Sequence, residues 1–174
     1  MKKSGLLFAL FFGLISMTYS QKYGYVDTQY ILENVPEYAD AQAELNKLSE
    51  QWMQEIEEKF MLVDKMQREF DSEAILLPEE IKKQRQQDID NARSAAMELQ
   101  KRRFGVGGDL FMKREELIKP IQDRIFTAIQ EIAIEGSYAF IFDKAIQSNL
   151  LYADSKFDLS DKVLRKMGIT IAKN

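Results

Sequence analysis

The chain has 174 residues, 45% of them hydrophobic and 30% charged, and a formal net charge of -4, which is typical of a folded, helix-rich protein. Because it contains neither cysteine nor histidine, the sequence excludes disulfide bonds, thiolate zinc sites and catalytic triads with a histidine base. We therefore predict no cofactor and no metal ion, and the acidic charge disfavours nucleic acid as a partner.

Residues 1–20 have the layout of a cleavable signal peptide. Two lysines precede an apolar run from Leu6 to Met17, and small residues follow just before a predicted cut ahead of Gln21. This order of charged, apolar and small residues is typical of an export signal. The alternative is an uncleaved membrane anchor, but the apolar run is short of the roughly 20 residues that a spanning helix needs. We therefore expect an exported chain.

Residues 21–36 are predicted to form the first part of a small body that contains short strands. The stretch from Lys22 to Asp27 is short, aromatic and β-branched, which predicts a strand. Asp27 is a good N-cap for a short helix that carries Ile31, and Pro36 interrupts that helix.

Residues 37–136 are predicted to form an arm, a coiled-coil hairpin of two long antiparallel helices. Apolar residues recur every three or four positions from Tyr38 to Phe70, so they form one stripe on a helix. The chain turns near residues 75–80, because the proline there suits the first position of a helix better than its interior. The outgoing helix, from Glu37 to Glu73, carries eleven acidic and four basic residues. The returning helix, from Glu79 to Arg124, carries nine acidic and eleven basic residues. Ion pairs should therefore set the register of the two helices.

Three glycines interrupt the returning helix near residues 105–108. Gly105, Gly107 and Gly108 each cost a helix about 1 kcal/mol relative to alanine. A phosphate-binding loop is not indicated, because no strand precedes the glycines and no Lys-Ser or Lys-Thr pair follows them. We predict a kink, a hinge or a local loop, after which Asp109 can cap the resumed helix.

Residues 137–174 complete the predicted body. Their composition predicts strands at 137–143 and 149–153 with a turn between them, and Asp158 or Ser160 can cap a last helix. The expected fold is therefore mostly α with a small β body (α+β).

A body of this size could hardly support a long two-helix arm alone, so we expect the chain to form an oligomer. The strands would then share one core between subunits. The oligomerisation candidates are the apolar and aromatic residues of the predicted strands and of the first short helix: Tyr25, Val26, Ile31, Phe140, Ile141, Phe142, Leu150, Leu151 and Tyr152.

Four stretches at the two ends of the chain together form a recognisable pattern: Tyr25-Val26-Asp27-Thr28-Gln29-Tyr30-Ile31-Leu32, Phe140-Ile141-Phe142-Asp143, Leu151-Tyr152-Ala153-Asp154 and Asp158-Leu159-Ser160-Asp161-Lys162-Val163-Leu164. In these stretches the chain resembles the Skp/OmpH family of periplasmic chaperones. The resemblance implies a periplasmic homotrimer in which a β body holds three helical hairpins around a cavity. It also implies that unfolded outer-membrane proteins are held in this cavity without ATP, so that they do not aggregate.

The charge of this chain departs from that family, whose well-known members are basic and are thought to attract acidic clients and lipopolysaccharide. The clusters Lys101-Arg102-Arg103 and Lys113-Arg114 are present, and we interpret both as solvated helix faces. No lipopolysaccharide site is therefore carried over to this sequence.

A chaperone that only holds its clients needs many weak contacts, and flexible methionines suit a surface that must fit varied partners. Residues on the stripe, such as Trp52 and Phe60, are interpreted as packing between the two helices. For residues just beside the stripe, packing and client contact both stay open, and the apolar residues at the turn are interpreted as contacts for a client or, transiently, a membrane. The client-binding candidates are Met53, Met61, Leu62, Ile75 and Leu76.

Two other functions would fit parts of this pattern. The first is a structural adaptor that bridges folded periplasmic partners through the tips of its hairpins. The second is an enzyme, which we disfavour because neighbouring carboxylates such as Glu79 and Glu80 point apart on a helix and no enclosed pocket is predicted. We predict no catalytic residue.

Overall fold

The computed structural model describes residues 21–146 and 150–170 of the chain. These residues form two compact units, one of residues 32–124 and one that combines residues 21–31 with 125–170. Long helices dominate, and a single two-stranded sheet is present among the described residues. The prediction of a mostly helical α+β fold is therefore confirmed.

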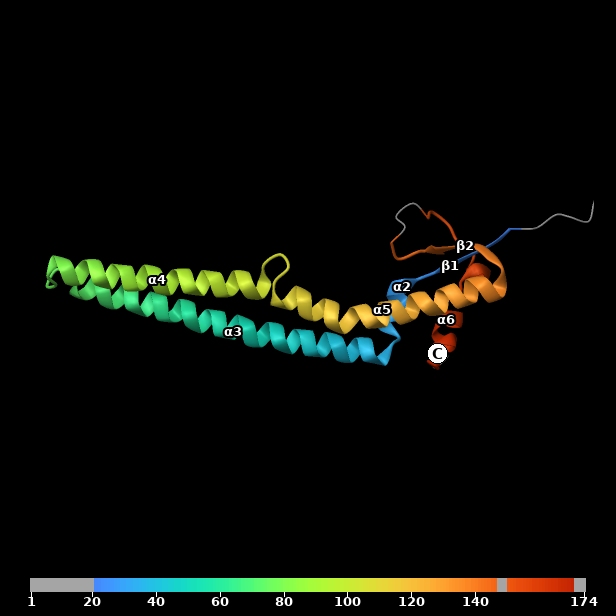
Figure 1. Cartoon of the computed structure of the whole chain (residues 1–174), viewed down its shortest axis with the longest axis horizontal. Helices are drawn as coiled ribbons and strands as arrows, with labels where there is room; N and C mark the ends of the chain where they lie inside the picture. Colours follow the sequence, from blue (N-terminus) through green and yellow to red (C-terminus); the bar gives the residue numbers. More distant parts are fainter. Residues whose placement is uncertain (1–20, 147–149, 171–174) are drawn as a thin grey trace, which may run out of the picture. The chain divides into compact units, whose positions relative to one another are not determined.

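The unit of residues 32–124 is a helical hairpin. Helix α3 (Pro36–Glu73) runs out, and α4 (Glu79–Phe104) returns beside it (Figure 1). The predicted stripe on α3 packs against the thinner apolar face of α4, where an alanine makes room for larger neighbours. The buried residues are Ala41, Leu45, Ile56 and Val63 on α3 and Ile89, Ala96 and Leu99 on α4.

The turn of the hairpin lies between Glu73 and Glu79. The amide of Ala74 donates to the carbonyl of Phe70 at 2.8 Å, which ends α3, and the amide of Leu76 donates to the carbonyl of Glu73 at 2.9 Å. Pro78 then stands immediately before α4 with an extended backbone. Its fixed φ suits this position, and Glu79 adds a negative charge where the helix dipole favours one.

The glycines near residue 105 form a loop rather than a bend in a continuous helix. Helix α4 ends at Phe104, and α5 (Asp109–Gly136) begins after the four residues 105–108. The loop stands out from the hairpin in Figure 1. The cap prediction was wrong by one residue, because the Gly108 carbonyl accepts the Met112 amide at 3.0 Å and Asp109 already lies inside the helix.

In the other unit, strands from opposite ends of the chain pair in parallel. Strand β1 (Lys22–Val26) pairs with β2 (Tyr138–Asp143), so that Tyr25 lies opposite Phe142. Between them in sequence, helix α2 (Thr28–Glu33) follows β1 directly. As the N-cap argument predicts, the Asp27 carboxylate accepts the amide of Tyr30 at 3.0 Å.

The third predicted strand is absent, so the prediction for residues 150–153 was wrong. These residues are irregular and lead into a short 3-10 helix (Ser155–Phe157) and then helix α6 (Ser160–Lys166). A strand needs a neighbour to pair with, and the free side of β1 is contacted near Tyr25 by Asp158 and Leu159 instead. The predicted turn at residues 147–148 lies outside the described residues, as does the predicted signal peptide.

Candidate functional site

The client-binding candidates on the hairpin are all exposed. Met53, Met61 and Leu62 lie on α3 beside the packed seam and are about half exposed, whereas Ile75 and Leu76 at the turn are 93% and 84% exposed. The stripe residues behave differently, because Ile56 is buried and Trp52, Phe60 and Phe70 are partly covered. Side chains beside the stripe are thus left free by helix packing.

Four further apolar residues of the hairpin unit that are more than half exposed were missed by the sequence analysis. They lie on α4, on the glycine loop and at the start of α5, and they are Met97, Val106, Phe111 and Met112. The signal that could have found them is the one used for Met53, since each is an apolar residue off the periodic stripe.

Three ion pairs tie the returning segment to α3. Arg124 binds Glu37 at 2.9 Å, Lys113 binds Glu44 at 3.4 Å, and Arg103 binds Glu55 at 3.3 Å. Each ion pair places a basic residue of the returning segment against an acidic residue of α3, as the opposite charge balance of the two helices predicts. Because Arg124 donates a hydrogen bond to it, the Glu37 carboxyl has a pKa below its ordinary value.

Arg103 also stands over an aromatic pair. Its guanidinium carbon lies 4.7 Å from the centre of the Trp52 ring, and the Trp52 and Phe104 rings meet edge to face with centroids 6.4 Å apart. Hydrogen bonds to Asp109 and Glu55 raise the pKa of Arg103. The interpretation of the two basic clusters as solvated faces was therefore wrong for Arg103 and Lys113, which are partly covered and paired with α3.

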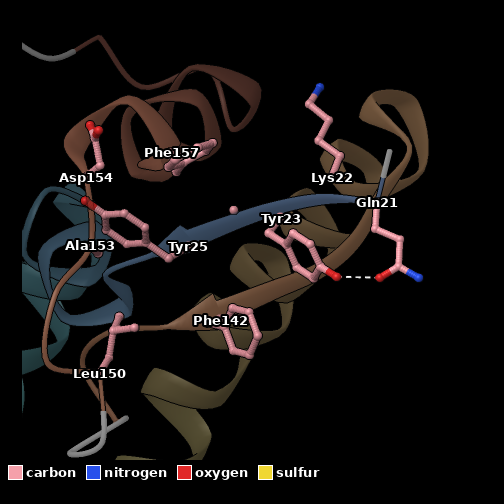
Figure 2. A pocket seen from close by; sticks show the side chains of 10 residues that line it. Gln21, Lys22, Tyr23, Tyr25, Phe142, Leu150, Ala153, Asp154 and Phe157 are labelled. Carbon is pink, nitrogen blue, oxygen red and sulfur yellow. Dashed lines mark hydrogen bonds between the residues drawn. The ribbon is translucent and has the colours of Figure 1, made fainter. Parts of the chain in front are cut away.

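The β-containing unit carries a groove of about 610 Å³, which the sequence analysis did not predict. Figure 2 shows it between β1, the end of β2 and the segment that includes Leu150 and Phe157. Burial and the hydrogen-bonded Asp158 carboxylate raise the pKa of the Tyr25 phenol. Aromatic and apolar side chains make up most of the wall: Tyr23, Tyr25, Phe142, Leu150 and Phe157.

Aromatic rings continue from the groove along the sheet. Tyr23 stacks on Phe140 with centroids 6.0 Å apart, and Phe140 stacks on Phe142 at 6.3 Å. Phe140 is nevertheless 58% exposed. A stack of exposed rings on a small sheet is apolar surface that residues 21–146 and 150–170 do not cover.

The oligomerisation candidates fall into two groups. Tyr25, Val26 and Ile31 are buried within the chain itself, and Ile141 is partly covered. The remaining candidates are exposed and so are the ones available to another subunit: Phe140, Phe142, Leu150, Leu151 and Tyr152.

Residues 21–146 and 150–170 contain no group of three or more acidic side chains that could hold a metal ion. Among the helices of this described part, none is long and apolar enough to cross a membrane.

Comparisons with known proteins agree with the resemblance seen in the sequence. Residues 22–167 match the family described as "Outer membrane protein (OmpH-like)". The chain is 27% identical over 160 residues to an uncharacterised protein of Aquifex aeolicus (strain VF5), covering 92% of this chain and 94% of that protein. Its fold is similar to the crystal structure of a candidate outer membrane chaperone (OmpH-like) from Caulobacter crescentus CB15, with a TM-score of 0.69, 11% identity and 89% of each chain covered.

Proposed function

We propose, from the premise that this chain belongs to the OmpH-like family of outer membrane proteins, that it is an ATP-independent chaperone of the periplasm. Its clients would be unfolded outer-membrane proteins, which it holds against its helical arm and keeps from aggregating. Family membership supports the chaperone role, and the similar Caulobacter protein is itself described as a candidate outer membrane chaperone.

The observation that carries this proposal is the row of exposed apolar side chains on a helical hairpin that is already packed without them. Met53, Met61 and Leu62 are not among the buried residues of α3, and each keeps about half of its surface in water. Flexible apolar side chains spaced along polar helices suit weak contacts with many unfolded sequences. Several arms acting on one client would turn such contacts into firm capture by raising the effective concentration.

A homotrimer would supply several arms, and the exposed aromatic face of the sheet supports such an assembly. Phe140 and Phe142 present a stack of rings to solvent, and Leu151 and Tyr152 are exposed on the following segment. A second copy of the chain would cover these rings and enlarge a core that is otherwise small.

Native mass spectrometry tests both parts of the proposal. The chain from Gln21 is measured alone and after addition of a urea-unfolded outer-membrane β-barrel protein. Three chains with one client would support the chaperone and the trimer together. A monomer would contradict the trimer, and a trimer that never carries the client would contradict the chaperone.

The second candidate function is an adaptor that bridges folded periplasmic partners through the tips of its arms. It is favoured by Ile75 and Leu76, which are almost fully exposed at the turn of the hairpin. Transient contact with a membrane would use the same two residues. The adaptor predicts binding of a folded partner without suppression of aggregation, which is the result that would separate it from the chaperone.

A further inference from the structure

Arg103 connects three helical segments at one point of the hairpin unit. It belongs to the last turn of α4. Its Nη1 binds the Asp109 carboxylate at 2.7 Å, at the start of α5, and its Nη2 binds Glu55 on α3 at 3.3 Å. The same guanidinium lies over the Trp52 ring of α3. A single side chain therefore spans the glycine loop and also fixes it to the facing helix.

The loop that Arg103 spans is folded tightly back on the end of α4. The Gly105 amide donates to the Lys101 carbonyl at 2.7 Å, and the Gly108 amide donates to the Gly105 carbonyl at 2.9 Å. A Cβ on Gly105 would lie only 2.3 Å from the Lys101 carbonyl oxygen, and Gly107 has a φ of +70°. This is one defined closed conformation, which needs glycine, rather than an unstructured link.

The same site also contains a feature that opposes the closed conformation. The Nε of Arg103 is buried and has no hydrogen-bond partner within the part of the chain that the structure describes. A buried donor without a partner costs free energy, which the two ion pairs must offset. Both acids are also partly exposed to solvent, so water can compete for the guanidinium when the loop opens.

We propose that Arg103 is a latch: while it binds Asp109 and Glu55, it holds α4, α5 and α3 together and keeps the arm from bending at residues 105–108. Release of Arg103 frees the loop and lets the arm bend there. In the chaperone, whose use of the latch rests on the proposed function, release would allow the arms to spread around a larger client.

Spin labels on either side of the loop would test the latch without any client. The sequence has no cysteine, so Glu98→Cys in α4 and Glu115→Cys in α5 introduce the sole thiols, and both positions are exposed. The labelled chain is refolded with an excess of unlabelled chain, so that only distances within one chain are measured. The width of the distance distribution then reports bending at the loop.

Arg103→Met should broaden this distribution and speed hydrogen exchange of the Gly108 amide by about tenfold, because charge-assisted hydrogen bonds hold the loop closed. The matched control is Lys113→Met, since Lys113 also pairs with α3 and is similarly covered, but does not span the loop. A distribution as narrow in Arg103→Met as in Lys113→Met would overturn the latch.

A second variant guards against a general loss of structure. Asp109→Asn keeps the shape of the side chain and removes only its charge, so it should also broaden the distribution while the helical circular dichroism stays that of the wild type. If Asp109→Asn leaves the width unchanged, Arg103 does not act through Asp109 and the latch is wrong.

The client experiment distinguishes failure of the latch from failure of the proposed function. If the wild type holds no client, the chaperone proposal fails, and the spin labels still decide the latch alone. If the wild type holds clients, Arg103→Met should hold larger β-barrels than Lys113→Met does. An identical size limit for the two variants would overturn the use of the latch in client binding.

Discussion

Lys166 joins α6 to the end of α5 within the β-containing unit. Its Nζ lies 2.6 Å from Glu135 and 3.1 Å from Glu131. The hydrogen bonds to these two acids raise the pKa of Lys166, and in return Lys166 lowers the pKa of Glu135. One lysine of α6 thus makes two ion pairs with the end of α5.

The shifted pKa values predict how pH acts on this contact. Because the folded pKa of Glu135 is below its usual 4.5, the contact stabilises the folded state above about pH 4.5 and is lost as the pH falls through the folded value. The raised pKa of Lys166 means that the contact is lost again as the pH rises through that value. Lys166→Met should therefore lower the Tm most near pH 7.

Calorimetry of the wild type and Lys166→Met between pH 3 and pH 7 would check this prediction. The control is Lys119→Met, which also removes a lysine but breaks an ion pair within one helix, Lys119 with Asp123. A Tm difference for Lys166→Met that does not shrink at acid pH would contradict the assigned role of Glu135.

For single residues, the sequence predicts the exposure of a side chain better than it predicts its ion-pair partners. The period of the stripe places Met53 and Met61 beside it, and both are exposed. The charge pattern placed Arg103 in a solvated basic cluster, because nothing in the run Lys101-Arg102-Arg103 shows which of the three basic side chains will contact the glycine loop. That choice depends on where α4 ends, and α4 ends where the glycine loop folds back.

The glycine loop is the element whose stability is most sensitive to a single methyl group. Gly105→Ala would place a Cβ 2.3 Å from a backbone carbonyl oxygen, and backbone cannot give way as a flexible side chain can. We expect a loss of about 1–3 kcal/mol in the free energy of unfolding, as for other overpacking changes. Urea unfolding followed by fluorescence would measure it, because Trp52 is the sole tryptophan and packs on Phe104 beside the loop.

Val106→Ala is the matched control, since Val106 belongs to the same loop and is fully exposed. It should leave the unfolding free energy within about 0.5 kcal/mol of the wild type. Equal effects of the two substitutions would mean that the close approach at Gly105 does not constrain the loop.

Helix α3 should lose client binding without losing stability when its exposed apolar row is made polar. We expect the triple variant Met53→Gln, Met61→Gln and Leu62→Gln to keep the wild-type Tm. Each lost apolar contact costs on the order of 1 kcal/mol, so suppression of aggregation should require at least roughly tenfold more protein. Light scattering of a β-barrel protein diluted from urea measures this.

The control for that variant changes three exposed charged residues of α3 instead: Glu57→Gln, Lys59→Gln and Asp64→Asn. It should suppress aggregation as the wild type does. If the polar triple variant suppresses aggregation as well as this control does, the exposed apolar row is not part of the client-binding surface.

Helices were also the elements that the sequence predicted best. A stripe from Tyr38 to Phe70 is a long periodic signal, and α3 follows it from Pro36 to Glu73. The third strand failed because composition alone suggested it at 149–153. A short apolar run can become a strand only if a free edge is available, and one chain does not reveal which edges other segments cover.

The whole molecule is predicted to assemble through the exposed face of its sheet. Phe140→Ser should shift the protein from trimer to monomer in sedimentation velocity, because each subunit would lose about 1.5–3 kcal/mol of apolar burial at the interface. Met97→Ser is the matched control, since Met97 is also 58% exposed but lies on the arm. If Phe140→Ser remains trimeric, or Met97→Ser also dissociates, this face is not the interface.

The family could be anticipated from the sequence, because the resemblance rests on stretches at both ends of the chain. The aromatic groove could not, since Tyr23, Phe142 and Phe157 come from three separate segments. Only the parallel register of β1 and β2 brings the first two together.

That parallel register also imposes an order on folding. The two strands lie near opposite ends of the chain, and the Asp27 amide donates a hydrogen bond to the Ser160 hydroxyl, 133 residues further on. Closing so long a loop carries an entropic cost, and contacts this distant in sequence form slowly. A chain synthesised from its N-terminus presents β1 long before β2 arrives, so the hairpin, built from neighbouring segments, can fold in the interval and shorten the search. The arm would then serve this protein's own folding before it serves that of any client.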